Sequence, residues 1–234
     1  MAEDASGLFP GLKVTTVKSS EDGRVRKLIL RLAGLSVKIE PSIVLRGSVF
    51  GVERRGLSSS AKNIFELSLD AQMLSLADLY GGKICAALDR QHPRDLFDIK
   101  LLLDGEGFTG NVRKAFIVYL ISHDRSMADL LDPRFQDITE MFNKEFAGMA
   151  FMDVAIEDLI ETRQRLVNTI RTELIGNERR FILSMKEGNP DWQLLEVSGI
   201  EDLPAIKWKL LNIARMTASK HKKALDKLRI CLEI

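Results

Sequence analysis

The sequence is poor in cysteine and aromatic residues and has almost no excess of charge. Its 234 residues include two cysteines, Cys85 and Cys231, which form no CxxC pair, so neither a disulfide framework nor a cysteine-rich zinc site is expected. Lysine and arginine number 34 against 33 acidic residues. Because this balance creates no global field, contact with nucleic acid or a membrane surface would have to be local.

Long apolar runs are also missing. The first residues, MAEDASGLFPG, are acidic and contain neither a basic leader region nor an apolar run long enough for a signal peptide or a membrane span. We therefore expect a cytoplasmic protein with no membrane partner. Its length suits one large domain or two small ones.

The first 50 residues have the character of β-strands. LKVTTVK alternates β-branched residues, and short apolar runs lie between turn residues in RVRKLILRLAG and LSVKIEPSIVLRG. This pattern predicts a three-stranded antiparallel meander. Residues 51–74 are less regular: Gly56 and the serines at 58–60 indicate a loop, and IFELSL a short strand.

The apolar period becomes helical from Ser75 onward. Ser75 and Asp78 form a capping-box signature, and Gly81 and Gly82 inside the predicted helix indicate a close approach by another backbone or a ligand. Pro93 suits the first turn of a second helix. Further helices are predicted at 110–123, 126–131, 135–147, 156–174, 177–187, 203–216 and 217–231. The fold class is thus α+β, a sheet followed by an all-α helical bundle.

Charged side chains gather in KICAALDRQHPRDLFDIKLLL, residues 83–103. At 100° per residue, Lys83 and Arg90 lie on the apolar side of the first helix, and Asp95 and Asp98 share an apolar face of the second. Carboxylates on such a face need partners, because burying unpaired charge costs several kcal/mol.

Two interpretations of this cluster are open. In one, it is a structural lock in which Arg90 and Arg94 pair with Asp95 and Asp98 and join the two helices. In the other, it is a phosphate-and-metal site in which lysine and arginine bind a polyphosphate and the carboxylates bind a metal or act as a base. Spacing alone does not choose between them.

The same residues resemble a known motif. Lys83, Arg90 and HPRDLFD resemble the K-x6-R-x3-RD-x2-D motif of the AbiEii/AbiGii nucleotidyltransferase family, the toxin half of bacterial abortive-infection and type IV toxin-antitoxin systems. EFAGM, ERRFILSMKEGNPDWQLL and LPAIKWKLLNIARM are also similar to that family. The resemblance runs from about residue 25 to the end. It implies transfer of a nucleotidyl group from a nucleoside triphosphate, with Mg²⁺, to an acceptor such as RNA, and a cognate antitoxin as partner.

The resemblance also implies roles for individual residues. Lys83 would bind the triphosphate together with Arg90 and Arg94, and Asp95 and Asp98 would support catalysis. Glu40 would be a metal ligand, because VKIEP resembles the strand that carries the third carboxylate of the nucleotidyltransferase sheet; the alternative is an exposed acid at a strand end. Residues 1–108 would form a partial nucleotidyltransferase-like α+β domain and residues 109–234 a helical C-terminal domain.

The sequence departs from the family pattern before Glu40. The Gly-Ser turn and the D-x-D pair expected there are missing, and the loss of two of three metal-binding acids should cripple Mg²⁺-dependent transfer. We expect a chain that lacks its N-terminal segment, or a degenerate relative, so whether it is an active enzyme stays open. A sheet edge left uncovered could be hidden in a homo-oligomer. The alternative function is a non-catalytic helical module that binds an antitoxin or RNA.

Overall fold

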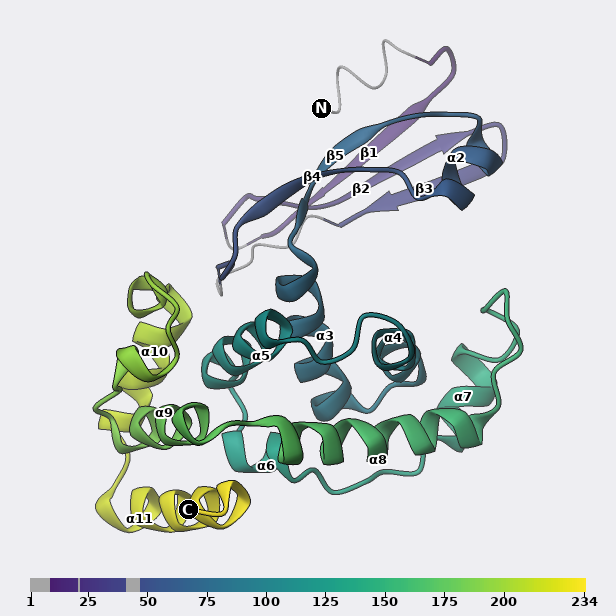
Figure 1. Ribbon diagram of the computed structural model, residues 1–234. Coiled ribbons are helices and arrows are strands. Elements are labelled where there is room, and N and C mark those ends of the chain that lie inside the picture. Colours follow the sequence, from purple (N-terminus) through teal and green to yellow (C-terminus); the bar gives the residue numbers. More distant parts are fainter. Residues whose placement is uncertain (1–8, 21, 41–46) are drawn as a thin grey trace. The chain divides into compact units, whose positions relative to one another are not determined.

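The structure, a computed structural model, describes residues 9–20, 22–40 and 47–234 (Figure 1). The chain divides into two compact units, Met1–Leu45 and Arg46–Ile234. In the described residues, small antiparallel sheets precede a long series of helices. The protein is therefore α+β, as predicted.

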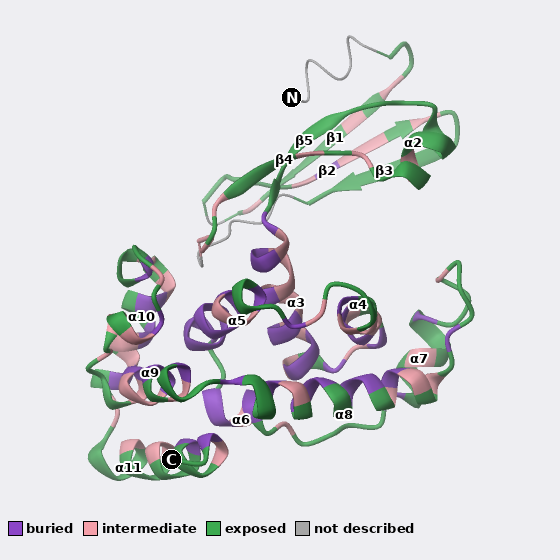
Figure 2. Ribbon diagram, viewed as in Figure 1, coloured by how far each residue is buried: buried purple, intermediate pink, exposed green. Residues whose placement is uncertain are grey.

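The first unit contains a three-stranded sheet. Its strands β1 (Lys13–Lys18), β2 (Val25–Leu32) and β3 (Leu35–Ile39) pair antiparallel in the order β1-β2-β3. A two-residue turn joins β2 to β3, and Ala33 and Gly34 both have positive φ, as tight hairpins require. The predicted meander is confirmed. Leu28 is the one strand residue of this described sheet that is buried (Figure 2).

The second unit begins with a hairpin that the sequence analysis misread. Strands β4 (Val52–Gly56) and β5 (Asp70–Leu74) pair antiparallel, and helix α2 (Ser59–Phe65) lies between them. The predicted loop at 58–60 and strand at 64–69 are both wrong. The Ser58 side chain accepts a hydrogen bond from the Ala61 amide at 3.2 Å, so the serines begin a helix instead of forming a loop.

Nine α-helices and two short 3₁₀ turns follow in the described residues. They are α3 (Leu76–Arg90), α4 (Pro93–Asp104), α5 (Gly110–Ser122), α6 (Met127–Leu131), α7 (Thr139–Glu145), α8 (Ile156–Glu173), α9 (Gly176–Glu187), η1 (Trp192–Leu194), η2 (Ile200–Asp202), α10 (Pro204–Ala214) and α11 (Ala218–Leu232). The predicted helices are confirmed to within a few residues, apart from the start of α7. Residues 135–138 are not helical, because Gln91 binds this segment through Arg134 O (2.9 Å) and Gln136 N (3.0 Å).

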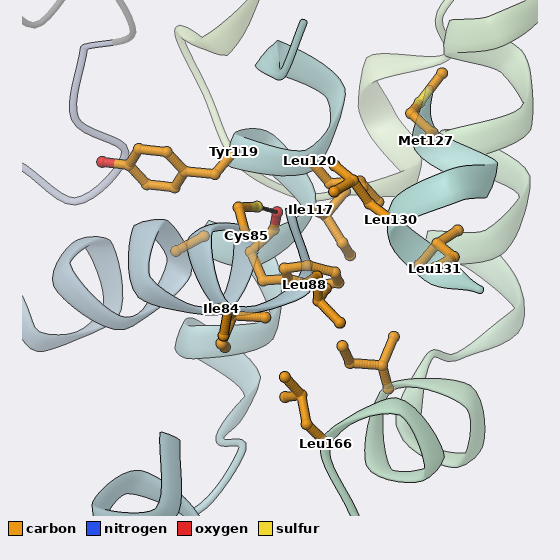
Figure 3. Packing of buried hydrophobic residues seen from close by; sticks show 14 of the residues in the cluster. Ile84, Cys85, Leu88, Ile117, Tyr119, Leu120, Met127, Leu130, Leu131 and Leu166 are labelled. Atoms are coloured by element: carbon orange, nitrogen blue, oxygen red, sulfur yellow. Dashed lines mark hydrogen bonds between the residues drawn. The ribbon is translucent and has the colours of Figure 1, made fainter. Parts of the chain in front are cut away.

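Helix α5 forms the centre of the hydrophobic core. Most of its residues from Val112 to Ser122 are buried, as expected of a helix that is apolar on all sides. Ile84 and Leu88 of α3 belong to one buried cluster with Ile117 and Leu120 of α5, part of which is drawn in Figure 3. Gly81 permits this packing, because a Cβ there would lie 2.9 Å from Ala115. The predicted close approach of a second backbone is confirmed at this glycine.

The same core joins α3 and α4 to the helices that follow them. Buried residues from Ala77 to Leu232 form one cluster, which includes Leu96 and Leu102 of α4. The predicted domain boundary after residue 108 falls between α4 and α5 and stays a prediction. In the described part of the chain, no helix is long and apolar enough to cross a membrane.

Candidate nucleotide-binding site

Two helix junctions position the charged cluster. Helix α3 begins at Ser75, whose hydroxyl accepts from the Asp78 amide at 3.0 Å, and ends at Gln91, which has a left-handed backbone (φ 51°). Helix α4 follows at once: Pro93 occupies its first turn, and His92 Nδ1 accepts from the Arg94 amide at 3.1 Å. This short turn brings the end of α3 beside the start of α4.

Lys83 and Asp98 form a direct ion pair between the two helices. The Lys83 ammonium donates to Asp98 Oδ2, and both side chains are about one-third exposed, at 32% and 33%. The structure therefore brings together two of the predicted site residues, 15 positions apart in sequence. Since the pair is open to water, a stronger anion can compete with Asp98 for the lysine.

Arg90 and Asp95 form the second pair. Arg90 Nη2 donates to Asp95 Oδ1 at 2.9 Å, and the arginine is 63% exposed whereas the aspartate is 15% exposed. Asp95 lies in the first turn of α4, where the helix dipole favours negative charge. Its other oxygen, Oδ2, is buried and has no hydrogen-bond partner among the described residues. This oxygen is thus enclosed by the protein without a hydrogen-bond partner in the part of the chain that the structure describes.

Arg94 does not take part in the predicted lock. Its Nη2 lies 3.4 Å from Glu145 Oε2 at the end of α7, and His92 Nε2 lies 3.1 Å from the same oxygen. The predicted arginine–aspartate pairing is therefore found for Arg90 with Asp95 only. It is wrong for Arg94, which pairs with Glu145, 51 residues away, and for Asp98, which pairs with Lys83. Arg94 is 58% exposed and can also reach a ligand in solution.

Glu40 lies in the first unit, directly after β3. It is exposed and its carboxylate pairs with the Lys27 ammonium of β2 at 2.9 Å. The hydrogen bond and charge of Lys27 hold the pKa of Glu40 below its ordinary value. Its assignment as a metal ligand stays a prediction. Among the described residues, no group of three or more His, Cys, Asp or Glu side chains is arranged so that it could hold a metal ion.

Asp78 makes more hydrogen bonds than the capping role that the sequence pattern predicted for it requires. It is 1% exposed, and its carboxylate accepts from the Val49 amide (2.7 Å), the Phe50 amide (2.9 Å), the Ser75 hydroxyl (2.9 Å) and the Tyr119 hydroxyl (3.2 Å). The Ser75 amide instead donates to Gly51 O at 3.3 Å, so only half of the predicted capping box forms. Asp78 therefore ties residues 49–50, which lead into β4, to α3.

A second group that the sequence did not reveal supports the turn between α3 and α4. Arg163 of α8 is 6% exposed and donates from Nη1 to Gln91 Oε1 at 2.8 Å and to Gln136 O at 2.7 Å. Its guanidinium also lies 4.4 Å from the centre of the Phe135 ring. Because Gln91 separates Arg90 from His92, these contacts hold the turn that places the charged cluster. The one sequence feature that could have indicated this role of Arg163 is its position on the otherwise apolar face of α8.

Lysine, arginine and carboxylate side chains gathered at a helix junction are residue types that also occur in sites that bind phosphate esters. A family model described as nucleotidyl transferase AbiEii toxin, type IV TA system, matches residues 5–212, which is most of the chain. The protein therefore belongs to the AbiEii family, as the resemblance indicated. Comparisons with curated proteins and with solved structures gave no significant match.

Proposed function

We propose that this chain binds a nucleoside triphosphate on the face shared by α3 and α4, the first step of a nucleotidyl transfer to an acceptor such as RNA. The observation that carries the proposal is the Lys83–Asp98 pair, a solvent-accessible cation on the family motif. Membership of a nucleotidyltransferase family supports the reaction type. An antitoxin is the partner that the family suggests.

Lys83 would bind the phosphates by exchanging its partner. A triphosphate carries several negative charges, so it attracts the ammonium more strongly than one carboxylate does and would displace Asp98. Arg90 and Arg94 are both more than half exposed and offer planar forks that suit phosphate oxygens. Mg²⁺ would arrive with the nucleotide as its counter-ion.

Transfer requires a hydroxyl of the acceptor to attack the α-phosphorus while the bond to pyrophosphate breaks. The proton of that hydroxyl would pass to a carboxylate, and Asp95 is the candidate because it is the acidic residue at the catalytic position of the motif that the chain resembles. The sequence has no D-x-D pair ahead of Glu40, so we propose that nucleotide binding is retained and that transfer is weak or absent.

A non-catalytic module that binds an antitoxin or RNA is the second candidate. It is favoured by helix α11, whose Lys220, Lys222 and Lys223 are exposed. A local basic face of this kind can bind a phosphate backbone although the net charge of the chain is only +1. In this case the α3–α4 cluster would serve the fold alone.

The test is calorimetry with Mg²⁺-nucleoside triphosphates on the wild type, on Lys83→Ala and on Lys207→Ala. Lys207 is a matched control, because it is 60% exposed and pairs with Asp202 at 2.9 Å on the surface of the same unit. We expect Lys83→Ala to lose about tenfold or more in affinity, the usual value of a charge-assisted phosphate contact, and the control to match the wild type. Equal affinities in all three proteins would overturn the proposal. Loss of RNA binding on replacing the three α11 lysines, with no nucleotide binding, would support the second candidate.

A further inference from the structure

A pocket lies one helical turn from Lys83. Its volume is about 390 Å³, and it is formed by the first turns of α3 and α5 together with residues before and within β4. Phe50 and Tyr80 give it two aromatic walls, and Leu76 and Val112 add apolar surface. Its size is within the usual range of small-molecule sites, roughly 300–1,000 Å³.

The pocket and the ion pair occupy one face of α3. At 100° per residue, Leu76, Tyr80 and Lys83 project from the same side of the helix, and Tyr80 precedes Lys83 by about 4.5 Å along the axis. Burial raises the pKa of Tyr80, the nearby Asp98 carboxylate raises it further, and Lys83 lowers it. The tyrosine therefore lies within the electrostatic reach of the Lys83–Asp98 pair.

The pocket and the Lys83 end of this α3 face differ in the charged side chains that they contain. The described residues that line the pocket include two carboxylates and no lysine or arginine; of the two, Glu53 is paired with Arg55 at 2.7 Å, and Glu106 forms no ion pair within the described chain. Carboxylates repel phosphate but accept hydrogen bonds from amino and hydroxyl groups. The pocket thus suits a flat, uncharged ring system with hydrogen-bond donors, whereas the lysine suits an anion. A nucleotide carries these two chemistries at its two ends.

We propose that this pocket binds the nucleoside end of the triphosphate whose phosphates Lys83 binds. The inference rests on the proposed function and adds a second subsite to it. Tyr80 and Phe50 stack on the base, as aromatic side chains do in nucleic-acid sites. Glu106 accepts from an amino or ribose hydroxyl group, and the Asn111 amide supplies both a donor and an acceptor at the rim.

The experiment compares nucleoside triphosphates with inorganic tripolyphosphate, which has the phosphates and no nucleoside. Calorimetry on the full chain is performed with each of the four ribonucleoside triphosphates and with tripolyphosphate, on the wild type, Glu106→Gln and Asn111→Ala. Both residues are exposed, so these variants should fold. The exposed Glu157→Gln and Asn168→Ala on α8 are the matched controls. Tyr80→Leu tests the stacking surface.

We expect the wild type to bind at least one triphosphate more tightly than tripolyphosphate. Glu106→Gln and Asn111→Ala should reduce that affinity about threefold to tenfold each, and Tyr80→Leu about tenfold, with tripolyphosphate affinity unchanged and the controls like the wild type. If the variants weaken both ligands equally, weaken neither, or alter only RNA binding, the nucleoside pocket is wrong. The same holds if the wild type binds both ligands equally, although the phosphate site then stands. If the wild type binds neither ligand, the proposed function fails and the pocket fails with it.

Discussion

Within the second unit, Arg46–Ile234, the charged side chains of the core and those of the α3–α4 face differ in how far they are exposed to water. In the core, Asp78 and Glu178 are each 1% exposed, and Lys209 is 8% exposed. On the face, Lys83 and Asp98 are about one-third exposed, and Arg94 is 58% exposed. Buried charges must be fully bonded within the protein, because leaving them unpaired is costly. The charges on the face are paired yet reach water, so a ligand can replace their partners.

The buried charges connect helices that are distant in sequence. The Arg113 guanidinium of α5 donates to both oxygens of Glu178 at 2.7–2.8 Å, and the same carboxylate accepts from the Ile175 amide at the start of α9. Lys209 of α10 donates to two backbone carbonyls between α5 and α6, those of His123 and Arg125. These groups hold the framework on which the open cluster is placed.

Replacement of Asp78 should have the largest effect on stability. Asp78→Ala would remove the buried carboxylate that accepts hydrogen bonds from the Val49 and Phe50 amides and two hydroxyl groups, and we expect a loss of about 3–5 kcal/mol in the free energy of unfolding. Urea unfolding, followed by the helical circular dichroism signal, measures it. The exposed Asp226→Ala on α11 is the control and should change stability by less than about 0.5 kcal/mol. If Asp78→Ala also lowered the free energy of unfolding by less than about 0.5 kcal/mol, the buried charges would contribute no more to stability than the exposed ones.

Lys209 should make the stability of the helical unit depend on pH. Burial lowers the pKa of Lys209 to about 8, below its ordinary value of 10.5. Between these pH values the unfolded chain holds the proton and the folded chain does not, so stability should rise as the pH increases from about 8 to 10.5. A shift of this size corresponds to roughly 3 kcal/mol.

The measurement is urea unfolding of the wild type and Lys209→Met across this pH window. As the pH rises through this window, the unfolding free energy of the wild type should increase relative to that of Lys209→Met. Lys207→Met, on the exposed side of the same helix, serves as the control and should show no such trend. A difference that is constant with pH would show that the buried lysine titrates normally.

Replacement of the open pair should have the smallest effect on stability. Because Lys83 and Asp98 are partly solvated, we expect Lys83→Ala or Asp98→Ala to cost less than about 1 kcal/mol in urea unfolding. A double-mutant cycle on this pair would give its coupling energy. A coupling energy of several kcal/mol would mean that the Lys83–Asp98 pair stabilises the fold as the buried charges do. The proposed difference between the core and the α3–α4 face would then be wrong.

Local patterns in the sequence were sufficient for much of the fold. Alternation and turn residues predicted the β1-β2-β3 meander, and apolar periodicity with Ser75 and Pro93 predicted α3 and α4. The failures lie where a distant contact or a cap competes with the local pattern. Gln91 and Arg163 hold residues 134–136, so α7 begins later than its periodicity indicates. Ser58 caps the start of α2, although the run of serines at 58–60 was predicted to be a loop.

The candidate site was only partly readable in the same way. The motif supplied Lys83, Arg90, Arg94, Asp95 and Asp98, but spacing could not assign their partners. Glu145, which binds Arg94, and Asp78, which anchors the chain leading into β4, carry no local signal of these roles. The pocket beside Tyr80 depends on α5 meeting α3, a contact that Gly81 allows but cannot specify.

The sequence by itself determined the first three strands, the order of the helices from α3 onward and the faces on which the charges lie, because periodicity and capping residues are local properties. The family was indicated by the resemblance of its motifs. Tertiary structure alone decided which charges became buried bonds and which stayed open to water. The reason is physical: the environment of a charge depends on the segments packed around it, and one carbonyl that Lys209 binds is 86 residues away in the chain.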